Sequence, residues 1–446
     1  MSDKAGTIDG KSTAGRLSRR SVLKGGAAAG AAGWTMRFPA VHGAEAGTIR
    51  IGYVGAISGP GNLFGECIDF VKKQVEKACA GGLTIGGKTY AIEVLVRDSQ
   101  SSINVAGQIA AELMTRQKVD LIVCPESFVA IAGGQMAVIN QTPIVSTLFP
   151  SDAMVAIRGG PDAYANKGKP WTFHFTFNTT DIGAIYMGLW RPFRNKLNGK
   201  VGTLYVDQPA AKGFADPNYG LPSFLNKEGY TIVDAGLFKN ETDDFSNQIS
   251  TFKNADTQIL TGFIFAYHFV PFWRTAAQTG FKPEIVCIAG AFLFPGGVDA
   301  LGDRGDGMAS EIWWTPKLPV VSSLTGQTAQ ALADEWEATQ NKQWSPVLGY
   351  THAAWEVAIA GLKASGDPKN REAVRSALSK LTLETVVGKL DFANSKIPGI
   401  AQTALAGGQW RKRKGGKYPY ELVVTYNDSA APFKIEDEFK LLSQLS

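Results

Sequence analysis

The stretch Thr48–Gly55, TIRIGYVG, opens the regular pattern of this sequence and indicates its fold class. Its apolar residues are rich in β-branched types and the run ends at glycine, which is typical of a buried strand that enters a tight turn. An amphipathic helical pattern follows over 65–80, and a second strand pattern follows over 90–96. A strand, a helix and another strand form the repeating unit of a parallel sheet covered by helices.

The same alternation continues along the chain and predicts an α/β protein. After three helical patterns near the C-terminus, two short strand patterns flank a loop rich in Gly and Lys. Because the β/α pattern restarts near residue 181, and because about 400 residues exceed what one core usually covers, we expect two lobes with a cleft between them. The expected helices are 104–117, 130–140, 181–197, 221–228, 245–253, 270–279, 327–339, 349–365 and 371–380; the expected strands are 120–124, 143–146, 200–206, 231–237, 258–265, 284–288, 388–392 and 421–426.

The first 46 residues have the layout of an export leader. Ser18-Arg19-Arg20-Ser21-Val22-Leu23-Lys24 precedes a short Gly- and Ala-rich apolar stretch, and Ala44-Glu45-Ala46 supplies the small residues of a cleavage site. The paired arginines resemble a twin-arginine signal. We therefore predict that 1–46 is a removable twin-arginine signal peptide and that the mature protein is soluble in the periplasm; a disordered basic tail is the alternative.

The charge of the whole chain, +5, comes mainly from this leader, which carries seven Lys/Arg and three Asp/Glu. The remainder is close to neutral, so nucleic acid is not an expected partner. The basic run Arg411-Lys412-Arg413-Lys414 lies between glycine pairs and is interpreted as a hairpin loop.

Cysteine and histidine are too few and too scattered to predict a metal site or a cofactor. Cys67 and Cys79 would lie about 18 Å apart on one helix, which excludes a bond between them; free thiols are expected, although a disulfide that involves Cys124 or Cys287 stays open. The sequence contains neither a nucleophile elbow nor a phosphate loop. Candidate acids (Asp98, Glu126, Asp207) and histidines (His174, His268, His352) form no catalytic pattern, so no enzyme activity is predicted.

Several segments, in the same order and spacing, resemble the leucine/isoleucine/valine-type (type I) periplasmic binding proteins of ABC transporters. These segments span about 47–395: 51–60 with Phe64-Gly65, 98–100, 119–123, 142–146, 276–281 and 350–355. The resemblance implies two β/α/β lobes joined by a hinge that closes on a solute. By analogy, lobe one comprises 47–177 plus 307–385, and lobe two comprises 178–306 plus 386–446. It further implies an ABC transporter permease as partner, and we expect a monomer.

The resemblance also carries ligand positions onto this sequence. It places an aromatic residue of the first turn at Phe64, a carboxylate-binding loop at Ser127 and Phe128, and a loop of backbone N–H groups at Leu148 and Phe149. In the second lobe it indicates Tyr267 and Phe292, of which Phe292 stands where the family usually has an acid that pairs with the ligand's ammonium group.

That missing acid decides the expected ligand. A buried ammonium group without a partner is costly, and the candidate loops are aromatic, with Trp313 and Trp314 near the hinge. We therefore predict an aromatic or hydrophobic organic acid as the solute. A branched-chain or other amino acid or amide is the alternative, for which Glu126 could replace the missing acid, and a ligand-presenting sensor is a second alternative.

Overall fold

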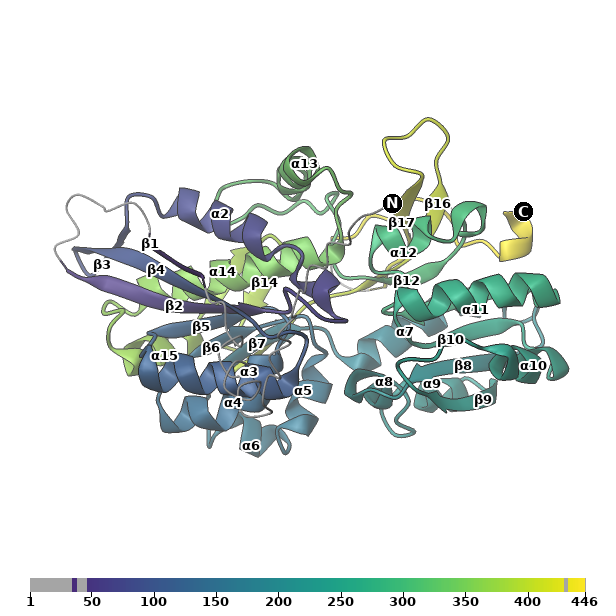
Figure 1. Ribbon diagram of the computed structural model, residues 1–446, viewed down its shortest axis with the longest axis horizontal. Helices are drawn as coiled ribbons and strands as arrows, with labels where there is room; N and C mark the ends of the chain where they lie inside the picture. Colours follow the sequence, from purple (N-terminus) through teal and green to yellow (C-terminus); the bar gives the residue numbers. More distant parts are fainter. Residues whose placement is uncertain (1–33, 38–45, 429–431, 446) are drawn as a thin grey trace, which may run out of the picture.

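The computed structural model describes residues 34–37, 46–428 and 432–445. The protein consists of two lobes that lie side by side, each built on one sheet with helices on both faces (Figure 1). The predicted signal peptide falls almost entirely outside the described residues. Within it, β1 (Trp34–Arg37) is described and pairs antiparallel with β4.

The first lobe is built on the sheet β1-β4-β2-β5-β6-β7-β15, with β3 beside β4. Its central strands pair in parallel and are buried on both faces, which explains their nearly continuous apolar sequences. Its strands are β2 (Thr48–Gly55), β3 (Leu83–Ile85), β4 (Lys88–Asp98), β5 (Leu121–Cys124), β6 (Ile144–Ser146), β7 (Thr172–Thr176) and β15 (Ile400–Gln402); its helices are α2 (Ile68–Ala78), α3 (Ile103–Ala111), α4 (Phe128–Ile139), α5 (Ser151–Ile157), α6 (Pro161–Ala165), α13 (Ala329–Gln340), α14 (Pro346–Ala364) and α15 (Arg371–Ser379), and β13 (Thr382–Thr385) pairs with β14 (Gly388–Asp391) in a hairpin.

The second lobe is built on the sheet β17-β16-β12-β11-β10-β8-β9. Strands β9, β8, β10, β11 and β12 are parallel, and the hairpin of β16 and β17 adds antiparallel strands beside β12. The strands are β8 (Lys200–Val206), β9 (Thr231–Phe238), β10 (Ile259–Phe263), β11 (Ile285–Ala289), β12 (Ala309–Ile312), β16 (Ala406–Lys412) and β17 (Tyr420–Tyr426); the helices are α7 (Thr179–Trp190), α8 (Pro209–Phe214), α9 (Leu221–Lys227), α10 (Ser246–Asn254), α11 (Ala266–Thr279) and α12 (Pro295–Asp299).

Both sheets have a topological switch point, where the strand order reverses. In the first lobe it lies between β2 and β5, because β4 is on one side of β2 and β5 is on the other. In the second lobe it lies between β8 and β10 for the same reason. Ligands of open α/β sheets bind beyond the carboxyl ends of the strands at such points.

The chain passes from one sheet to the other three times within its described part: after β7, after β12 and after β15. Aromatic side chains hold these crossings together. The rings of Phe177 and Trp313 lie 4.9 Å apart, and those of Trp313 and Tyr350 lie 6.0 Å apart. The Tyr350 hydroxyl is 2.7 Å from that of Thr403 on the third crossing. Motion of one lobe relative to the other therefore has to act on this cluster.

Two short strands lie in a different sheet from the one that the predicted lobe boundaries imply. Residues 309–312 were assigned to lobe one, but β12 lies in the second sheet between β11 and β16. Residues 400–402 were assigned to lobe two, but β15 pairs in parallel with β7 in the first sheet. These strands have three or four residues each, too few for a sequence pattern to show which sheet they join.

The cysteines, the possible metal ligands and the helix lengths were also compared with the predictions. All four cysteines are buried free thiols, and Trp190 and Tyr186 lie beside Cys287. Over the described ranges, His, Cys, Asp and Glu side chains form no group that could hold a metal ion. A membrane-spanning helix is likewise not found among the described helices, none of which combines the necessary length and apolarity.

Candidate ligand-binding cleft

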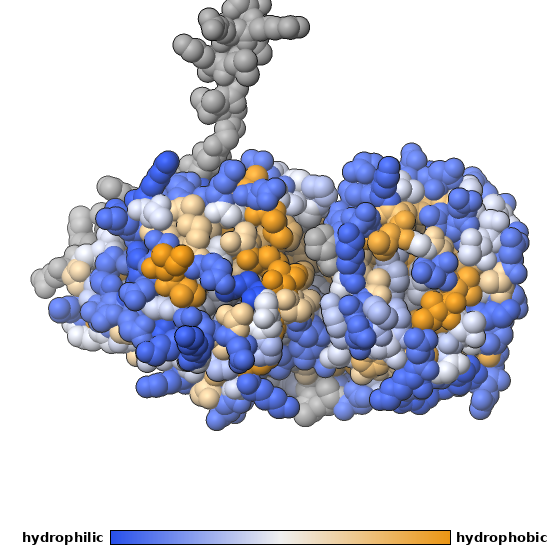
Figure 2. Space-filling view, turned by 90° about the horizontal axis from the view of Figure 1, so that it is seen from below, coloured by the Kyte–Doolittle hydropathy of each residue, from blue (hydrophilic) through white to orange (hydrophobic). Residues whose placement is uncertain are grey.

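A cavity of about 360 Å³ lies between the two lobes, at the point where both switch points face each other. Its wall includes residues within two positions of the ends of the switch-point strands: Ala56 after β2, Glu126 after β5, Gln208 after β8 and Phe265 after β10. Seen from below, apolar surface gathers beside the boundary between the two halves (Figure 2). The further lining residues of this cavity, called here the central cavity, are Pro60, Gly61, Phe64, Ser101, Ile103, Phe128, Ile131, Leu148, Phe149, Pro150, Ala153, Ile157, Phe177, Thr179, Ile182, Ala210, Phe214, Phe263, Leu293, Glu311 and Trp313.

Aromatic rings form most of the wall and come from both lobes and from the hinge. The first lobe contributes Phe64, Phe128 and Phe149, and the crossings contribute Phe177 and Trp313. The second lobe adds three phenylalanines, and their rings form a continuous row: those at positions 214 and 263 are 4.9 Å apart, and those at 263 and 265 are 5.6 Å apart. A wall of this kind stabilises a flat or branched apolar body by burial and ring contacts.

Glu126 is the most unusual polar group in the central cavity. It follows β5 and is buried, and neither of its carboxyl oxygens has a hydrogen-bond partner among the residues that the structure describes. Burial raises the pKa of Glu126 from 4.5 to about 8; its own backbone N–H and the nearby Ser99 hydroxyl act to lower this pKa, and the charge of Asp98 acts to raise it. A buried acid without a partner costs stability, so its place in the wall points to a ligand group.

A second acid, Glu311, enters the cavity wall from β12. Its Oε2 accepts hydrogen bonds from the Tyr186 hydroxyl at 2.6 Å and from the Ser310 hydroxyl at 3.1 Å. Burial raises its pKa, whereas these hydrogen bonds act to lower it. The indole N–H of Trp313 lies close enough to Glu311 to help lower the pKa of this acid. The cavity therefore presents one acid without a partner, Glu126, and one acid surrounded by donors, Glu311.

The first turn, which carries Phe64, is held in place by residues at the end of β4. Asp98 accepts hydrogen bonds from the backbone N–H groups of Ile57 and Ser58 at 3.0 and 3.1 Å, and from the Ser58 hydroxyl at 2.6 Å. Ser101 accepts from the Gly61 N–H at 3.0 Å. Burial would raise the pKa of Asp98, but these hydrogen bonds lower it on balance. Asp98 is therefore a structural acid of this turn.

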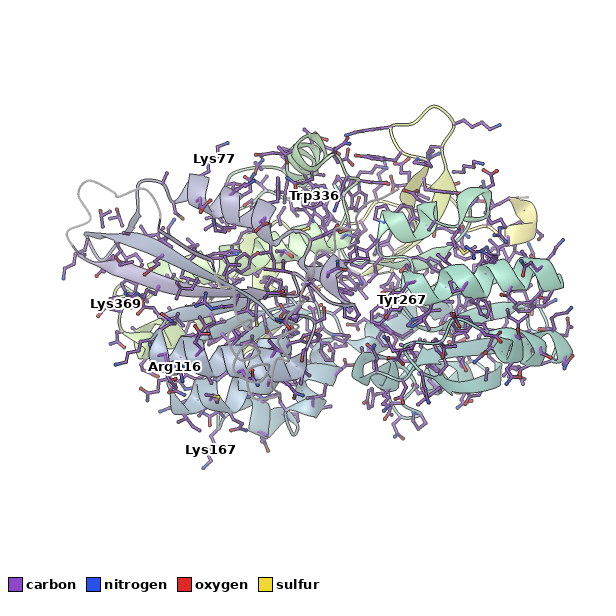
Figure 3. All side chains as sticks on the ribbon, viewed as in Figure 1. Lys77, Arg116, Lys167, Tyr267, Trp336 and Lys369 are labelled. Atoms are coloured by element: carbon purple, nitrogen blue, oxygen red, sulfur yellow. The ribbon has the colours of Figure 1, made fainter. Side chains whose placement is uncertain are left out.

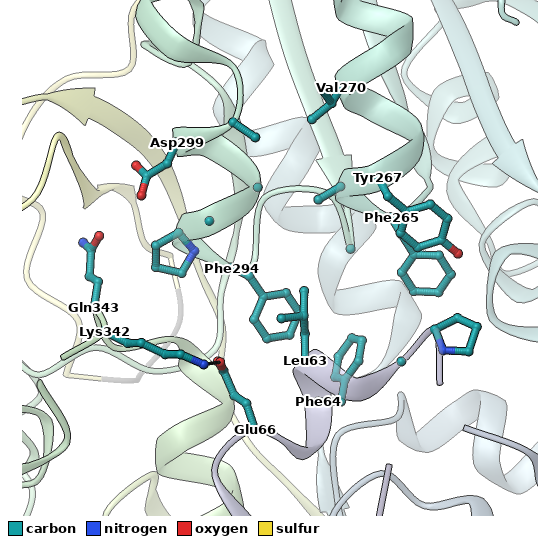
Figure 4. Close-up of a pocket in the computed structure, with 18 of the residues that line it drawn as sticks. Leu63, Phe64, Glu66, Phe265, Tyr267, Val270, Phe294, Asp299, Lys342 and Gln343 are labelled. Atoms are coloured by element: carbon teal, nitrogen blue, oxygen red, sulfur yellow. Dashed lines mark ion pairs between the residues drawn. The ribbon is translucent and has the colours of Figure 1, made fainter. Parts of the chain in front are cut away.

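A second cavity, of about 590 Å³, adjoins the central one and shares Phe64 and Phe265 with it (Figure 4). We call it the outer cavity. The Phe64 ring meets that of Phe294 from the second lobe edge-to-face at 5.1 Å. The outer cavity is more polar: Lys342 pairs with Glu66 at 3.7 Å on one side of it. Phe64 thus stands at the point where the two cavities and the two lobes meet.

The structure places four of the seven predicted site residues, Phe64, Phe128, Leu148 and Phe149, in the central cavity wall. Tyr267 lines the outer cavity instead, and its hydroxyl donates to Asn240 Oδ1 at 2.8 Å. Ser127 and Phe292 line neither cavity.

The two residues outside the wall are buried for identifiable reasons. Ser127 has a left-handed backbone (φ 67°), and its hydroxyl donates to the Thr147 carbonyl, so the hydroxyl is turned into the protein. Phe292 packs edge-to-face on Phe269 at 4.8 Å in the core of the second lobe. Sequence reasoning missed Glu311 and the phenylalanines of the second lobe. Only Phe263 and Phe265 carried a usable signal, because they lie at the end of the predicted strand 258–265.

The three described histidines have structural partners. His174 connects β7 to the loop of Phe149: its Nε2 is 2.7 Å from the Phe149 carbonyl oxygen, and its Nδ1 is 2.9 Å from the Ser146 hydroxyl. His268 Nε2 lies 2.8 Å from the Asn240 carbonyl, and His352 Nε2 lies 2.8 Å from the Ser322 hydroxyl. Burial lowers the pKa of all three. They support loops and strands, and none lines either cavity.

Comparison with known families agrees with this geometry. The model of one family, described as periplasmic binding protein, matches residues 48–417. The chain belongs to the periplasmic binding protein family. The match includes the strands from β2 to β16 and the whole wall of the central cavity, so the cleft belongs to the part of the chain that defines the family. Solute-binding proteins of this kind bind small molecules without transforming them.

Solved structures show the same two-lobed, type I fold. A leucine binding protein from Thermotoga maritima is 16% identical with a TM-score of 0.68, and the match covers 85% of this periplasmic binding protein and 99% of that chain. A branched-chain amino acid binding protein from Streptococcus pneumoniae, in complex with isoleucine, is 20% identical with a TM-score of 0.64 and coverages of 84% and 99%. A solute binding protein from R. palustris, in complex with 4-hydroxybenzoate, is 16% identical with a TM-score of 0.67 and coverages of 85% and 96%.

The state of Glu126 leads to a prediction for the empty periplasmic binding protein. Because its pKa is raised when the protein folds, the folded state binds more protons than the unfolded state between about pH 4.5 and 8, and stability falls as pH rises through this range. Glu126→Gln should remove this dependence and raise the free energy of unfolding at pH 7 by about 3 kcal/mol. Urea unfolding at pH 5 and pH 7 measures both quantities.

The matched control is Glu384→Gln, at an exposed position on β13. This variant should keep the pH dependence of the wild-type protein. Equal pH dependence in wild type and in Glu126→Gln would contradict the account of Glu126 as a buried, unpaired acid.

Proposed function

We propose that this protein is the solute-binding component of an ABC importer and that it captures a small organic solute with an aromatic or hydrophobic body in the central cavity. The observation that carries the proposal is the ring wall contributed by both lobes and by the hinge. A cavity of this size and composition, with a few polar groups, suits a small organic molecule. The protein would work outside the cytoplasmic membrane, delivered by the predicted signal peptide, and would pass its solute to a permease.

Two solute classes were expected from the sequence: an aromatic or hydrophobic organic acid, and a branched-chain or other amino acid or amide. The aromatic wall of the central cavity favours a solute with an apolar body, which both classes have. The complexes with isoleucine and 4-hydroxybenzoate show that this fold accommodates each kind of body. For the present chain, Phe64, Phe128 and Phe149 take the positions that would contact such a body.

The hinge gives a mechanism for capture. Phe177 and Trp313 belong both to the cavity wall and to the aromatic cluster that joins the crossings. A solute that contacts them from one side and the rings of the second lobe from the other would bring the lobes together. A ligand shifts this equilibrium only by as much as its affinity differs between the open and the closed state, and contacts made to both lobes at once supply such a difference.

Isothermal titration calorimetry with two panels tests the proposal. Aromatic acids and amines form the first panel together with branched-chain amino acids, and sugars and polyols form the second. We expect saturable, one-site binding to a member of the first panel and no heat from the second. Tight binding of a sugar would contradict the proposed solute class.

A further inference from the structure

The central cavity combines aromatic walls with buried acids and holds no basic side chain among its described lining residues. Polar lining groups are confined to Ser101, Glu126, Thr179, Gln208 and Glu311, together with the indole N–H of Trp313. Four basic residues of the first lobe, Lys77, Arg116, Lys167 and Lys369, lie at its outer edges, away from the second lobe (Figure 3). A negatively charged solute would therefore find no basic side chain in this wall to pair with.

The hydroxyl groups near the β5 and β6 loops do not compensate for this lack of positive charge. Ser127 donates to the Thr147 carbonyl, and Thr147 itself donates to the Phe175 carbonyl at 2.7 Å. Ser151 donates to the Thr176 carbonyl at 3.3 Å. Because each hydroxyl proton is already used inside the first lobe, none of these groups is free to donate to a ligand carboxylate.

Glu126, in contrast to these hydroxyl groups, has no hydrogen-bond partner inside the first lobe. Neither of its carboxyl oxygens has a hydrogen-bond partner within the described structure, the side chain is more than nine-tenths buried, and the residue lines the cavity. The surrounding aromatic faces favour a cation as well, because the π faces of Phe and Trp carry negative potential. The unpaired acid and the rings both indicate the same kind of ligand group.

We propose that the solute is an organic ammonium compound, with its ammonium group donating to the Glu126 carboxylate and its apolar body between the rings of the two lobes. This inference rests on the proposed function and adds the charge of the solute to it. It assigns to Glu126 the role that the missing acid near Phe292 would otherwise have. Glu311, the second acid of the wall, is already held by hydrogen bonds from Tyr186 and Ser310, which leaves Glu126 as the acid without a partner.

The ionisation of Glu126 makes the proposal sensitive to pH. The ionisable groups that face it are Tyr53 from β2, Asp98 from β4 and Cys124 from β5. Burial raises the pKa of Tyr53 and of the Cys124 thiol, so both are neutral near pH 7, and Asp98 is charged. With the pKa of Glu126 at about 8 in the empty protein, ammonium binding at pH 7 should release a proton, and affinity should rise up to about pH 8.

The test uses three probes of nearly equal shape: 2-phenylethylammonium, 2-phenylethanol and 3-phenylpropanoate. They share the phenylethyl body and differ in the terminal group, which is a cationic ammonium, a neutral hydroxyl or a somewhat larger anionic carboxylate. Calorimetry of the full chain at pH 7 should show the ammonium compound binding roughly a hundredfold more tightly than the alcohol, as expected for a buried charge-assisted hydrogen bond. Its affinity should rise between pH 6 and pH 8, with proton release detected by comparing buffers of different ionisation enthalpy.

Glu126→Gln keeps the size of the side chain and removes its charge. It should weaken binding of the ammonium compound roughly a hundredfold and change binding of the alcohol less than threefold. Glu384→Gln serves as the control and should change neither. Retained binding of the alcohol by the Glu126→Gln variant shows that its cavity is intact.

Three results would overturn the inference. In the first, the propanoate binds most tightly and its affinity falls as pH rises through 8. A protonated Glu126 then donates to a ligand carboxylate, so the solute is an anion and only the proposed apolar body is kept. If all three probes bind equally, the solute's assigned positive charge is wrong, and only the proposal of a solute with an apolar body is kept. If none binds, both the inference and the apolar solute class are contradicted.

Discussion

Phe292→Ala is expected to lower the free energy of unfolding by about 4 kcal/mol while changing solute affinity less than threefold. Phe292 is 1% exposed, packs edge-to-face on Phe269, and lines neither cavity. The backbone carbonyl of the same residue accepts a hydrogen bond from Trp410 Nε1 at 2.8 Å, which ties this loop to β16. Removal of the ring therefore leaves a hole in the core of the second lobe and not in the ligand site.

The matched variant is Phe128→Ala, which removes the same ring from the central cavity wall. Because Phe128 is partly exposed at the start of α4, we expect a smaller loss of stability and a tenfold or larger loss of affinity for a phenyl-bearing solute. Urea unfolding and calorimetry on both variants measure the two effects. A loss of affinity at Phe292 equal to that at Phe128 would restore the family-based prediction of Phe292 as a ligand contact.

Gly262→Ala is expected to cost about 4 kcal/mol or more and to prevent folding of the second lobe at moderate temperature. Gly262 lies in β10 with φ +136°, a backbone conformation that side chains rarely adopt, and a Cβ there would approach the Leu204 carbonyl oxygen to 1.9 Å. Leu204 is its partner in the parallel ladder of β8. No side-chain rotation can relieve this contact, because the obstacle is backbone.

The control for this variant is Gly213→Ala in α8. A Cβ at Gly213 meets no atom within 4 Å, so alanine should be neutral or stabilise the helix slightly. Thermal unfolding followed by circular dichroism compares the two. A Gly262→Ala variant as stable as wild type would show that β8 and β10 do not pair closely here, and Phe263 and Phe265 would lose the support that places them in the cavity wall.

Sequence patterns predicted the elements that carry a strong local signal. The bounds of β2 and β8 agree with the prediction residue for residue, since both strands are mostly apolar runs that end at a turn. β12 and β15 were misassigned because a strand of three or four residues is positioned by its neighbours. For β15 the neighbour is β7, more than 200 residues earlier in the chain.

The same limit applies to the site. The family resemblance places Phe64, Phe128 and Phe149 at ligand positions, and all three line the central cavity. The direction of a side chain could not be predicted: Ser127 turns inward because of its left-handed backbone, and Glu126 beside it lines the cavity. Glu311 lies inside a strand, and only the second sheet's arrangement shows that it faces the cavity.

The central claim is that a solute with an apolar body occupies the central cavity, and mass spectrometry of bound molecules tests it most directly. The purified protein is incubated with a metabolite extract, washed and denatured, and the released compounds are compared with those released from Ala210→Trp, in which a large ring from the second lobe fills the cavity. We predict enrichment of a small solute with an aromatic or branched apolar body by the wild-type protein, and its loss in the variant. Enrichment of a wholly polar compound, or equal enrichment by both proteins, would contradict the claim.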